Sequence, residues 1–226
     1  MSRLKVAALS LAALAALLAA PLLFTPKPEP GGGRAISHGL PWQIETPAPG
    51  TSRVFGLTLG GAAPSTLADA RRVFPEVVKL ALLAPTDQPL ALEAYFDSVS
   101  VGPLAGKLVL NLASPTAELE AMRARAAKTD HLETGIRKFV LNDADAIRAE
   151  TLPLAGIVFI PGASLDEAII LQRFGPPAER IRQGETLEHF LYPDKGLDVV
   201  LDARGREVLQ YVAPAEFARM RAPLGK

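Results

Sequence analysis

The sequence predicts an α+β fold made of two similar β-α-β-β-β units, each a helix on an antiparallel sheet, after an N-terminal membrane anchor or signal segment. Short β-like runs alternate with compact amphipathic segments from Arg53 to the end of the chain. Most boundaries between them carry Pro or Gly, the residues of tight connections. The same order of elements occurs twice, which indicates a duplicated unit.

The first segment, residues 1–24, is a signal or anchor helix. Arg3 and Lys5 precede Val6–Phe24, a run of nineteen residues without a charged side chain. As a helix this run would span about 28 Å, close to the thickness of a bilayer's hydrocarbon core. The preceding positive charges place the rest of the chain outside the cytoplasm. We therefore expect one inner-membrane helix with the body in the periplasm, or a periplasmic protein if the segment is cleaved.

Residues 25–50 are rich in Pro and Gly and predict a tether that builds no core of its own. Trp42, the single tryptophan, is expected to pack on the folded domain or to lie at the lipid interface.

Residues 51–152 form the first α+β unit and a helical connection. Thr66 and Asp69 have the spacing of a capping box, and Pro75 ends the helix that follows. Ser114 and Asn142 are predicted N-caps. The expected elements are a strand Val54–Leu59, a helix to Phe74, strands Val77–Ala84, Leu90–Asp97 and Lys107–Leu112, a helix Pro115–Lys128, a strand Ile136–Leu141 and a short helix to Glu150.

Residues 153–226 form the second unit, and Ser164 with Glu167 is its predicted capping box. Phe74 and Phe174 end the two equivalent helices, so residues 53–112 and 154–212 are expected to superpose; chance similarity of short patterns is the alternative. The expected elements are a strand Leu154–Ile160, a helix to Phe174, and strands Glu179–Gln183, Leu187–Tyr192, Leu197–Ala203 and Glu207–Val212.

Residues 154–212 carry turn and cap residues in a particular order. Gly162 precedes a helix opened by a hydroxyl-x-x-acid box, Gly175 and Pro176 stop that helix, and an aromatic strand ends at Tyr192. In these features the segment resembles the SmpA/OmlA (BamE-like) outer-membrane assembly lipoproteins. The resemblance implies a small periplasmic helix-on-sheet scaffold that binds other envelope proteins. The chain departs from that family because no lipobox Cys follows the apolar run.

Composition argues against several functional classes. The chain has no Cys, which excludes Cys-ligated zinc or iron–sulfur sites and Cys nucleophiles, and no cofactor is expected. Its 24 basic and 24 acidic side chains give no net positive charge, which argues against general nucleic-acid binding. His189 lies between Leu187 and Leu191 in a predicted strand, so a buried structural histidine is favoured over a ligand or general base.

Two predicted strands combine aromatic and acidic side chains on one face. Alternation along the strands groups Glu93 with Tyr95, and Glu188 with Phe190 and Tyr192. Such a face is either covered by a neighbouring element or binds a partner. These five residues are therefore the candidate partner-binding set.

The sequence favours a membrane-anchored periplasmic (envelope) binding or scaffold protein without catalytic activity, contacting the membrane through its N-terminal helix and an envelope protein through its body. The alternative is an envelope hydrolase with a site at the junction of the two units. A weaker possibility is a domain that holds a small apolar molecule between helix and sheet. A deep junction pocket that includes His189 would favour the enzyme, and a shallow apolar-acidic face would favour the binder.

Overall fold

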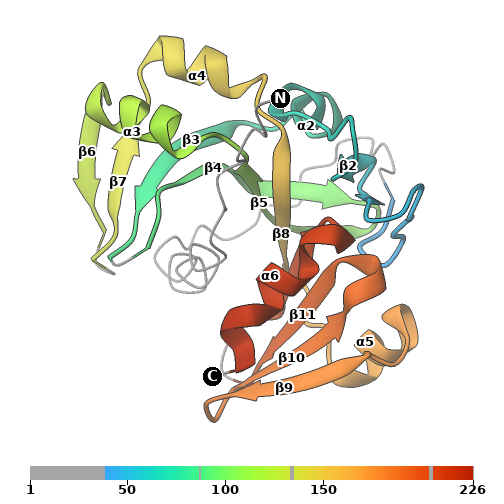
Figure 1. Ribbon diagram of the computed structural model, residues 1–226. Helices are drawn as coiled ribbons and strands as arrows, with labels where there is room; N and C mark the ends of the chain where they lie inside the picture. Colours follow the sequence, from blue (N-terminus) through green and yellow to red (C-terminus); the bar gives the residue numbers. More distant parts are fainter. Residues whose placement is uncertain (1–38, 87, 133–134, 204–205, 226) are drawn as a thin grey trace, which may run out of the picture.

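The computed structural model describes residues 39–225 except 87, 133–134 and 204–205 (Figure 1). The described residues form five α-helices and a large antiparallel sheet, which confirms the predicted α+β class. The predicted anchor Val6–Phe24 lies outside them. None of the helices in the described part has both the length and the apolar character needed to cross a bilayer.

Most elements follow the predicted order, but the predicted helix Pro115–Lys128 ends at Ala124, and Lys128 begins a strand that the sequence did not predict. Along the chain they are β1 (Ser52–Val54), β2 (Leu57–Leu59), α2 (Leu67–Val73), β3 (Val78–Ala84), β4 (Ala91–Val101), β5 (Leu104–Leu112), α3 (Thr116–Ala124), β6 (Lys128–His131), β7 (Arg137–Val140), α4 (Asp143–Ala149), β8 (Leu154–Pro161), α5 (Glu167–Phe174), β9 (Glu179–Gln183), β10 (Leu187–Tyr192), β11 (Leu197–Asp202), β12 (Val208–Val212) and α6 (Phe217–Arg221), with 3-10 turns at Pro193–Lys195, Pro214–Glu216 and Ala222–Gly225.

Ten strands form one sheet in the order β6-β7-β3-β4-β5-β8-β12-β11-β10-β9, and all neighbours are antiparallel. The two halves of the chain meet where β5 pairs with β8, from Gly106 opposite Pro161 to Leu112 opposite Leu154. The junction of the predicted units is therefore a hydrogen-bonded ladder within one sheet.

The predicted strand Val54–Leu59 is a tight hairpin instead. β1 and β2 pair with each other, and the chain reverses at Phe55 and Gly56, whose φ angles are +54° and +76°. The Phe55 ring is buried, with its centroid 5.6 Å from both Phe159 and Tyr211. Burial of this ring offsets the cost of a left-handed backbone at a non-Gly residue, about 1–3 kcal/mol.

The two predicted units do not have the same topology. In both, a helix is followed by an antiparallel meander, β3-β4-β5 after α2 and β9-β10-β11-β12 after α5. The first strands differ, because β8 lies inside the large sheet while the β1–β2 hairpin forms a separate sheet. β8 is already paired on both sides, by β5 and β12, so the hairpin finds no free edge there and packs against the sheet.

Two of the four predicted helix caps are wrong in detail. The Thr66–Asp69 box and the Asn142 cap form as expected. α3 begins after Pro115, and the Ser114 hydroxyl donates to Glu118 instead. The N-cap of α5 is Asp166, whose carboxylate accepts from the Ile169 N–H at 2.8 Å, while the Ser164 hydroxyl donates to Glu207 across 2.9 Å. At α5 a carboxylate closer to the helix takes the place of the predicted hydroxyl cap, whereas the N-cap of α3 is Pro115, which has no side-chain cap hydrogen bond.

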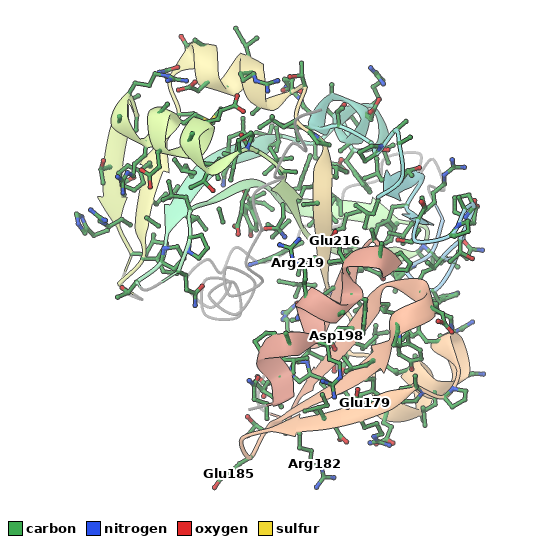
Figure 2. The ribbon with its side chains drawn as sticks, in the orientation of Figure 1. Glu179, Arg182, Glu185, Asp198, Glu216 and Arg219 are labelled. Atoms are coloured by element: carbon green, nitrogen blue, oxygen red, sulfur yellow. The ribbon has the colours of Figure 1, made fainter. Side chains whose placement is uncertain are left out.

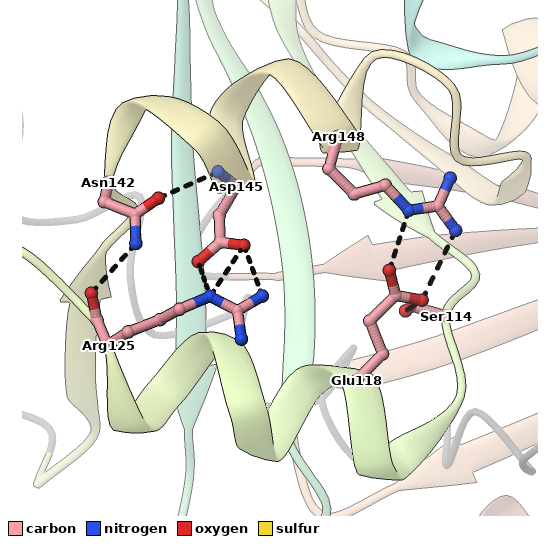
Figure 3. Close-up of polar contacts among 6 residues, drawn as sticks. All are labelled: Ser114, Glu118, Arg125, Asn142, Asp145 and Arg148. Atoms are coloured by element: carbon pink, nitrogen blue, oxygen red, sulfur yellow. Dashed lines mark hydrogen bonds and ion pairs between the residues drawn. The ribbon is translucent and has the colours of Figure 1, made fainter.

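Helices α3 and α4 are joined by two ion pairs (Figure 3). Arg125 donates to both carboxylate oxygens of the buried Asp145, at 2.6–3.1 Å. Arg148 donates to Glu118 at 2.7 Å. The carboxylate oxygens of Asp145 and Glu118 all accept hydrogen bonds from these arginines. The cluster therefore holds the two helices together and is not a candidate reactive site.

The main core lies on one face of the sheet, under α2, α3, α4, α5 and the hairpin. Trp42, from the predicted tether, packs edge-on against Phe174 of α5 at 6.4 Å, and the Arg173 guanidinium lies 4.7 Å from its ring centroid. The Tyr211 hydroxyl donates to the Pro41 carbonyl at 2.9 Å. The folded body therefore begins before Thr51.

Candidate binding face

A second apolar cluster lies on the sheet face opposite α2–α5. Cross-strand pairing puts Tyr95, Val109 and Val158 in one row and Val200 beside Val208. We call this cluster the valine face. Its members are Val109, Val158, Ile160, Val200 and Val208, with the half-buried Tyr95 and Leu187 packed against them.

The valine face is a single layer of strand side chains. Its five aliphatic members are 1–7% exposed. Within the described part of the chain, the cluster includes no side chain from a helix or from a second sheet. Strand β8 is apolar toward both faces, a composition expected when both faces of a sheet are covered, whereas β5 places Lys107 and Asn111 beside Val109 on the valine-face side.

Helix α6 covers only the β9–β12 end of this face. Phe217 and Met220 pack on Leu191 and Val212. In Figure 1, α5 and α6 lie on opposite sides of this end of the sheet. The cluster under α6 is distinct from the valine face, which continues from it toward β4.

Glu93 places a carboxyl group on the same face as the valines. It is 5% exposed and lies opposite the buried Asn111 in the register of β4 and β5. Its Oε1 has no hydrogen-bond partner among the described residues. Burial raises the pKa of Glu93 to about 8, so the carboxyl group is mostly protonated near neutral pH.

His189 and Asp198 form a buried pair on this face. Figure 2 shows Asp198 beside α6. Nδ1 of His189 lies 2.8 Å from Asp198 Oδ2, and Nε2 lies 3.4 Å from Gln183 Oε1. Asp198 Oδ1 has no partner in the described structure, and burial raises the pKa of Asp198. The pair is the predicted structural histidine, with both ring nitrogens engaged.

Comparison with protein-family models, characterised proteins and solved structures finds no match to this chain.

The predicted partner-binding residues fall on two different faces. Glu93 and Tyr95 belong to the valine-face side. Phe190 and Tyr192 lie in the main core, where the Arg180 guanidinium covers Phe190 at 4.3 Å and the Tyr192 hydroxyl donates to the Gly175 carbonyl. These two aromatic residues are thus covered by the protein itself, which was the alternative expectation for them.

Glu188 is held by its neighbours on the edge strand. It lies on the same side of β10 as Phe190 and accepts a hydrogen bond from Arg180 at 3.0 Å. This arginine lowers the pKa of Glu188. Glu188 therefore completes an ion-pair network on β9 and β10, apart from the valine face.

The hydrolase alternative required a pocket at the junction of the units. There β5 and β8 are adjacent strands, and His189 lies on β10, three strands from β8. Among the described residues, no group of three or more His, Asp or Glu side chains is close enough to hold a metal ion. An open hollow elsewhere is lined mainly by the Thr46–Thr51 loop with Pro193 and Pro214.

The valine face itself was missed because its members lie far apart in sequence. β4, β5, β8, β12, β11 and β10 contribute to it, and the pairing of β8 with both β5 and β12 cannot be predicted from local patterns. One signal was present: Ile157–Ile160 is apolar at every position, which is typical of a strand covered on both faces.

Proposed function

We propose that this protein is a non-catalytic, membrane-anchored binding or scaffold protein of the cell envelope, and that its valine face receives an apolar segment of an envelope partner. The observation that carries the proposal is the single-layer apolar cluster on one face of the ten-stranded sheet. A sheet face of this kind needs a second layer, and an apolar chain segment supplies one.

The polar groups on this face define the partner further. Glu93 Oε1 is buried without a donor in the described structure. A hydroxyl or amide group of the partner segment can both donate and accept, so it would match this oxygen whether or not the oxygen carries the acid proton; an unmatched buried polar atom costs about 1–3 kcal/mol. We therefore propose an apolar segment with a hydroxyl or amide side chain, rather than a purely aliphatic one.

Two sequence features support the envelope setting. The apolar run Val6–Phe24 with Arg3 and Lys5 before it has the length and charge placement of an inner-membrane anchor. The likeness of residues 154–212 to the SmpA/OmlA domain supports a scaffold that contacts other envelope proteins. Both remain part of the proposal.

Photo-crosslinking in intact cells tests the binding face. A photoreactive amino acid is placed at Tyr95, which is half-buried on the valine face, and a matched control at Ile147, which is 72% exposed on α4. The expected result is a discrete crosslinked envelope protein from position 95 and none from position 147. The same products from both positions would contradict a binding role for this face.

Fractionation tests the location independently. The full chain is expected in the inner-membrane fraction, with its body digested by protease added to spheroplasts. A soluble protein whose N-terminus lies at or after Pro21 would remove the anchor and leave only export to the periplasm.

A further inference from the structure

We propose that, when no partner is bound, the valine face is occupied by the chain's own apolar segment, Val6–Phe24. This inference rests on the proposed function, because it names a competing occupant of the same face. Membrane insertion and occupation of the face would then be alternative states of one segment.

The first argument is coverage. The five aliphatic side chains of the valine face are nearly inaccessible, yet the described hydrophobic residues in their cluster all come from strands of the sheet itself. Beyond the described residues, the chain offers residues 1–38 and otherwise only single positions or pairs, at 87, 133–134, 204–205 and 226. Among these residues of the sequence, only 1–38 include a segment long enough to cross several strands.

The second argument is size. The face extends from β4 to β10, six adjacent strands, which corresponds to about 24 Å at the usual spacing between strands. Val6–Phe24 would be about 28 Å long as a helix. Its uncharged composition, mostly Ala and Leu, suits contact with valines and would be costly to expose to water.

The third argument is reach. The described chain starts at Gly39, and the side chain of the next residue, Leu40, packs against Gly102. A Cβ atom built on Gly102 would lie only 2.8 Å from Leu40 Cδ2. Gly102 is in the turn between β4 and β5, two strands that contribute to the valine face. Residues 25–38, which connect Phe24 to this point, can span roughly 46 Å when extended.

Cysteine crosslinking of the full chain tests the inference, and the absence of native Cys makes the background clean. The test pair is Ala13→Cys with Tyr95→Cys, and the control pair is Ala13→Cys with Ile147→Cys on α4. Each purified protein is treated with a short bismaleimide without membrane or detergent. Gel filtration and far-UV circular dichroism check that each variant is folded.

We expect a monomer-sized crosslink in the test pair that forms about tenfold faster than in the control pair, because a docked segment raises the effective concentration of the two thiols. Adding phosphatidylglycerol-containing vesicles should suppress it as the segment enters the bilayer. Equal rates in the two pairs would overturn the inference. A dimer-sized product alone would also overturn it, by assigning the face to a second copy.

A charge substitution gives a second readout. Leu14→Asp should release the segment and increase the fluorescence of an apolar dye such as ANS severalfold, since the valine face becomes accessible. Ala35→Asp, within residues 25–38, is the matched control and should leave the signal unchanged. Unchanged dye binding in folded Leu14→Asp protein would contradict the inference.

Failure of this inference is distinguishable from failure of the proposed function. A partner crosslinked from position 95 in cells, without the intramolecular product in the purified chain, would overturn the inference and leave the proposed function standing. The intramolecular product without any cellular partner would do the reverse.

Discussion

At the scale of single residues, the acids on the valine-face side of the sheet have contrasting surroundings. Asp198 has the His189 ring against one oxygen. Glu93 Oε1 has no such neighbour in the described part of the chain, and burial is the cause of its raised pKa. The neutral, protonated form of Glu93 is therefore more stable in this buried position than the ionised form.

Glu93→Gln is expected to change how stability depends on pH. Between about pH 5 and 8 the folded protein keeps the Glu93 proton, because the pKa is about 8, while the unfolded chain has lost it. The unfolded state then binds fewer protons, so the wild-type free energy of unfolding falls as pH rises, by up to about 1.4 kcal/mol per pH unit. Relative to Glu93→Gln, wild type should lose stability across this window in urea titrations.

Tyr95→Phe is the control for this experiment, since it lies on the same strand and its pKa is about 12, outside the window. A constant difference between wild type and Glu93→Gln from pH 5 to 8 would show that Glu93 is ionised in the folded protein.

His189→Ala is expected to lower stability by about 1–3 kcal/mol, through a small cavity and loss of the hydrogen bond between His189 and the buried Asp198. His131→Ala, at an exposed position on β6, should leave the melting temperature nearly unchanged. Thermal melts of both variants are the measurement. An unchanged melting temperature for His189→Ala with a lost cellular phenotype would reassign His189 to a functional site.

At the scale of elements, turns decide where strands can go. Gly184 and Gly196 both have φ of +66°, but their surroundings differ. A Cβ at Gly196 would lie 2.0 Å from the Val212 carbonyl oxygen, whereas none of the described atoms lies within 4 Å of a Cβ at Gly184. The same backbone conformation therefore occurs once in a crowded place and once in an open one.

Gly184→Ala should cost about 1–2 kcal/mol, the penalty of a left-handed Ala. Gly196→Ala should cost clearly more, because a backbone carbonyl in the adjoining ladder must move as well. Urea unfolding of the two variants measures the difference directly. Equal losses would mean that β12 shifts freely and that the packing around Gly196 is loose.

Element boundaries were largely predictable from local chemistry, and the exceptions have physical reasons. Asn142 and the Thr66–Asp69 pair act through neighbours three residues away, so their spacing was sufficient. The reversal at Phe55 depends on packing against Phe159 and Tyr211, more than a hundred residues distant, and no local pattern encodes it. The valine face depends on the order of strands in the sheet and could not be predicted from local patterns either.

At the scale of the whole molecule, β6 and β9 are the two edge strands of the sheet that the described residues form. β9 reads Glu-Arg-Ile-Arg-Gln, and in Figure 2 Arg182 and Glu185 point away from the body at this edge. β6 is short and polar, from Lys128 to His131. Charged, short edges discourage sheet extension by another chain, so association is expected through a face rather than an edge.

The continuous ladder between β5 and β8 predicts that the body unfolds as one unit. Trp42 reports on the second half, because it packs on Phe174. A Tyr95→Trp variant in a Trp42→Phe background reports on the first half. The two urea transitions, followed by fluorescence, should coincide. An earlier transition at either probe would mean that the halves fold independently.

The central position of β8 also has a kinetic consequence for a chain that is synthesised from its N-terminus. β3, β4 and β5 can pair as soon as they emerge, and so can β9 to β12. β8 pairs with residues about 40 to 55 positions before it and about 50 to 56 after it, so both of its ladders close over long loops. Pairing of β8 with β5 and β12 is therefore the slow folding step expected from the topology. Until these strands pair, the edges of β5 and β12 are exposed to chaperones and proteases.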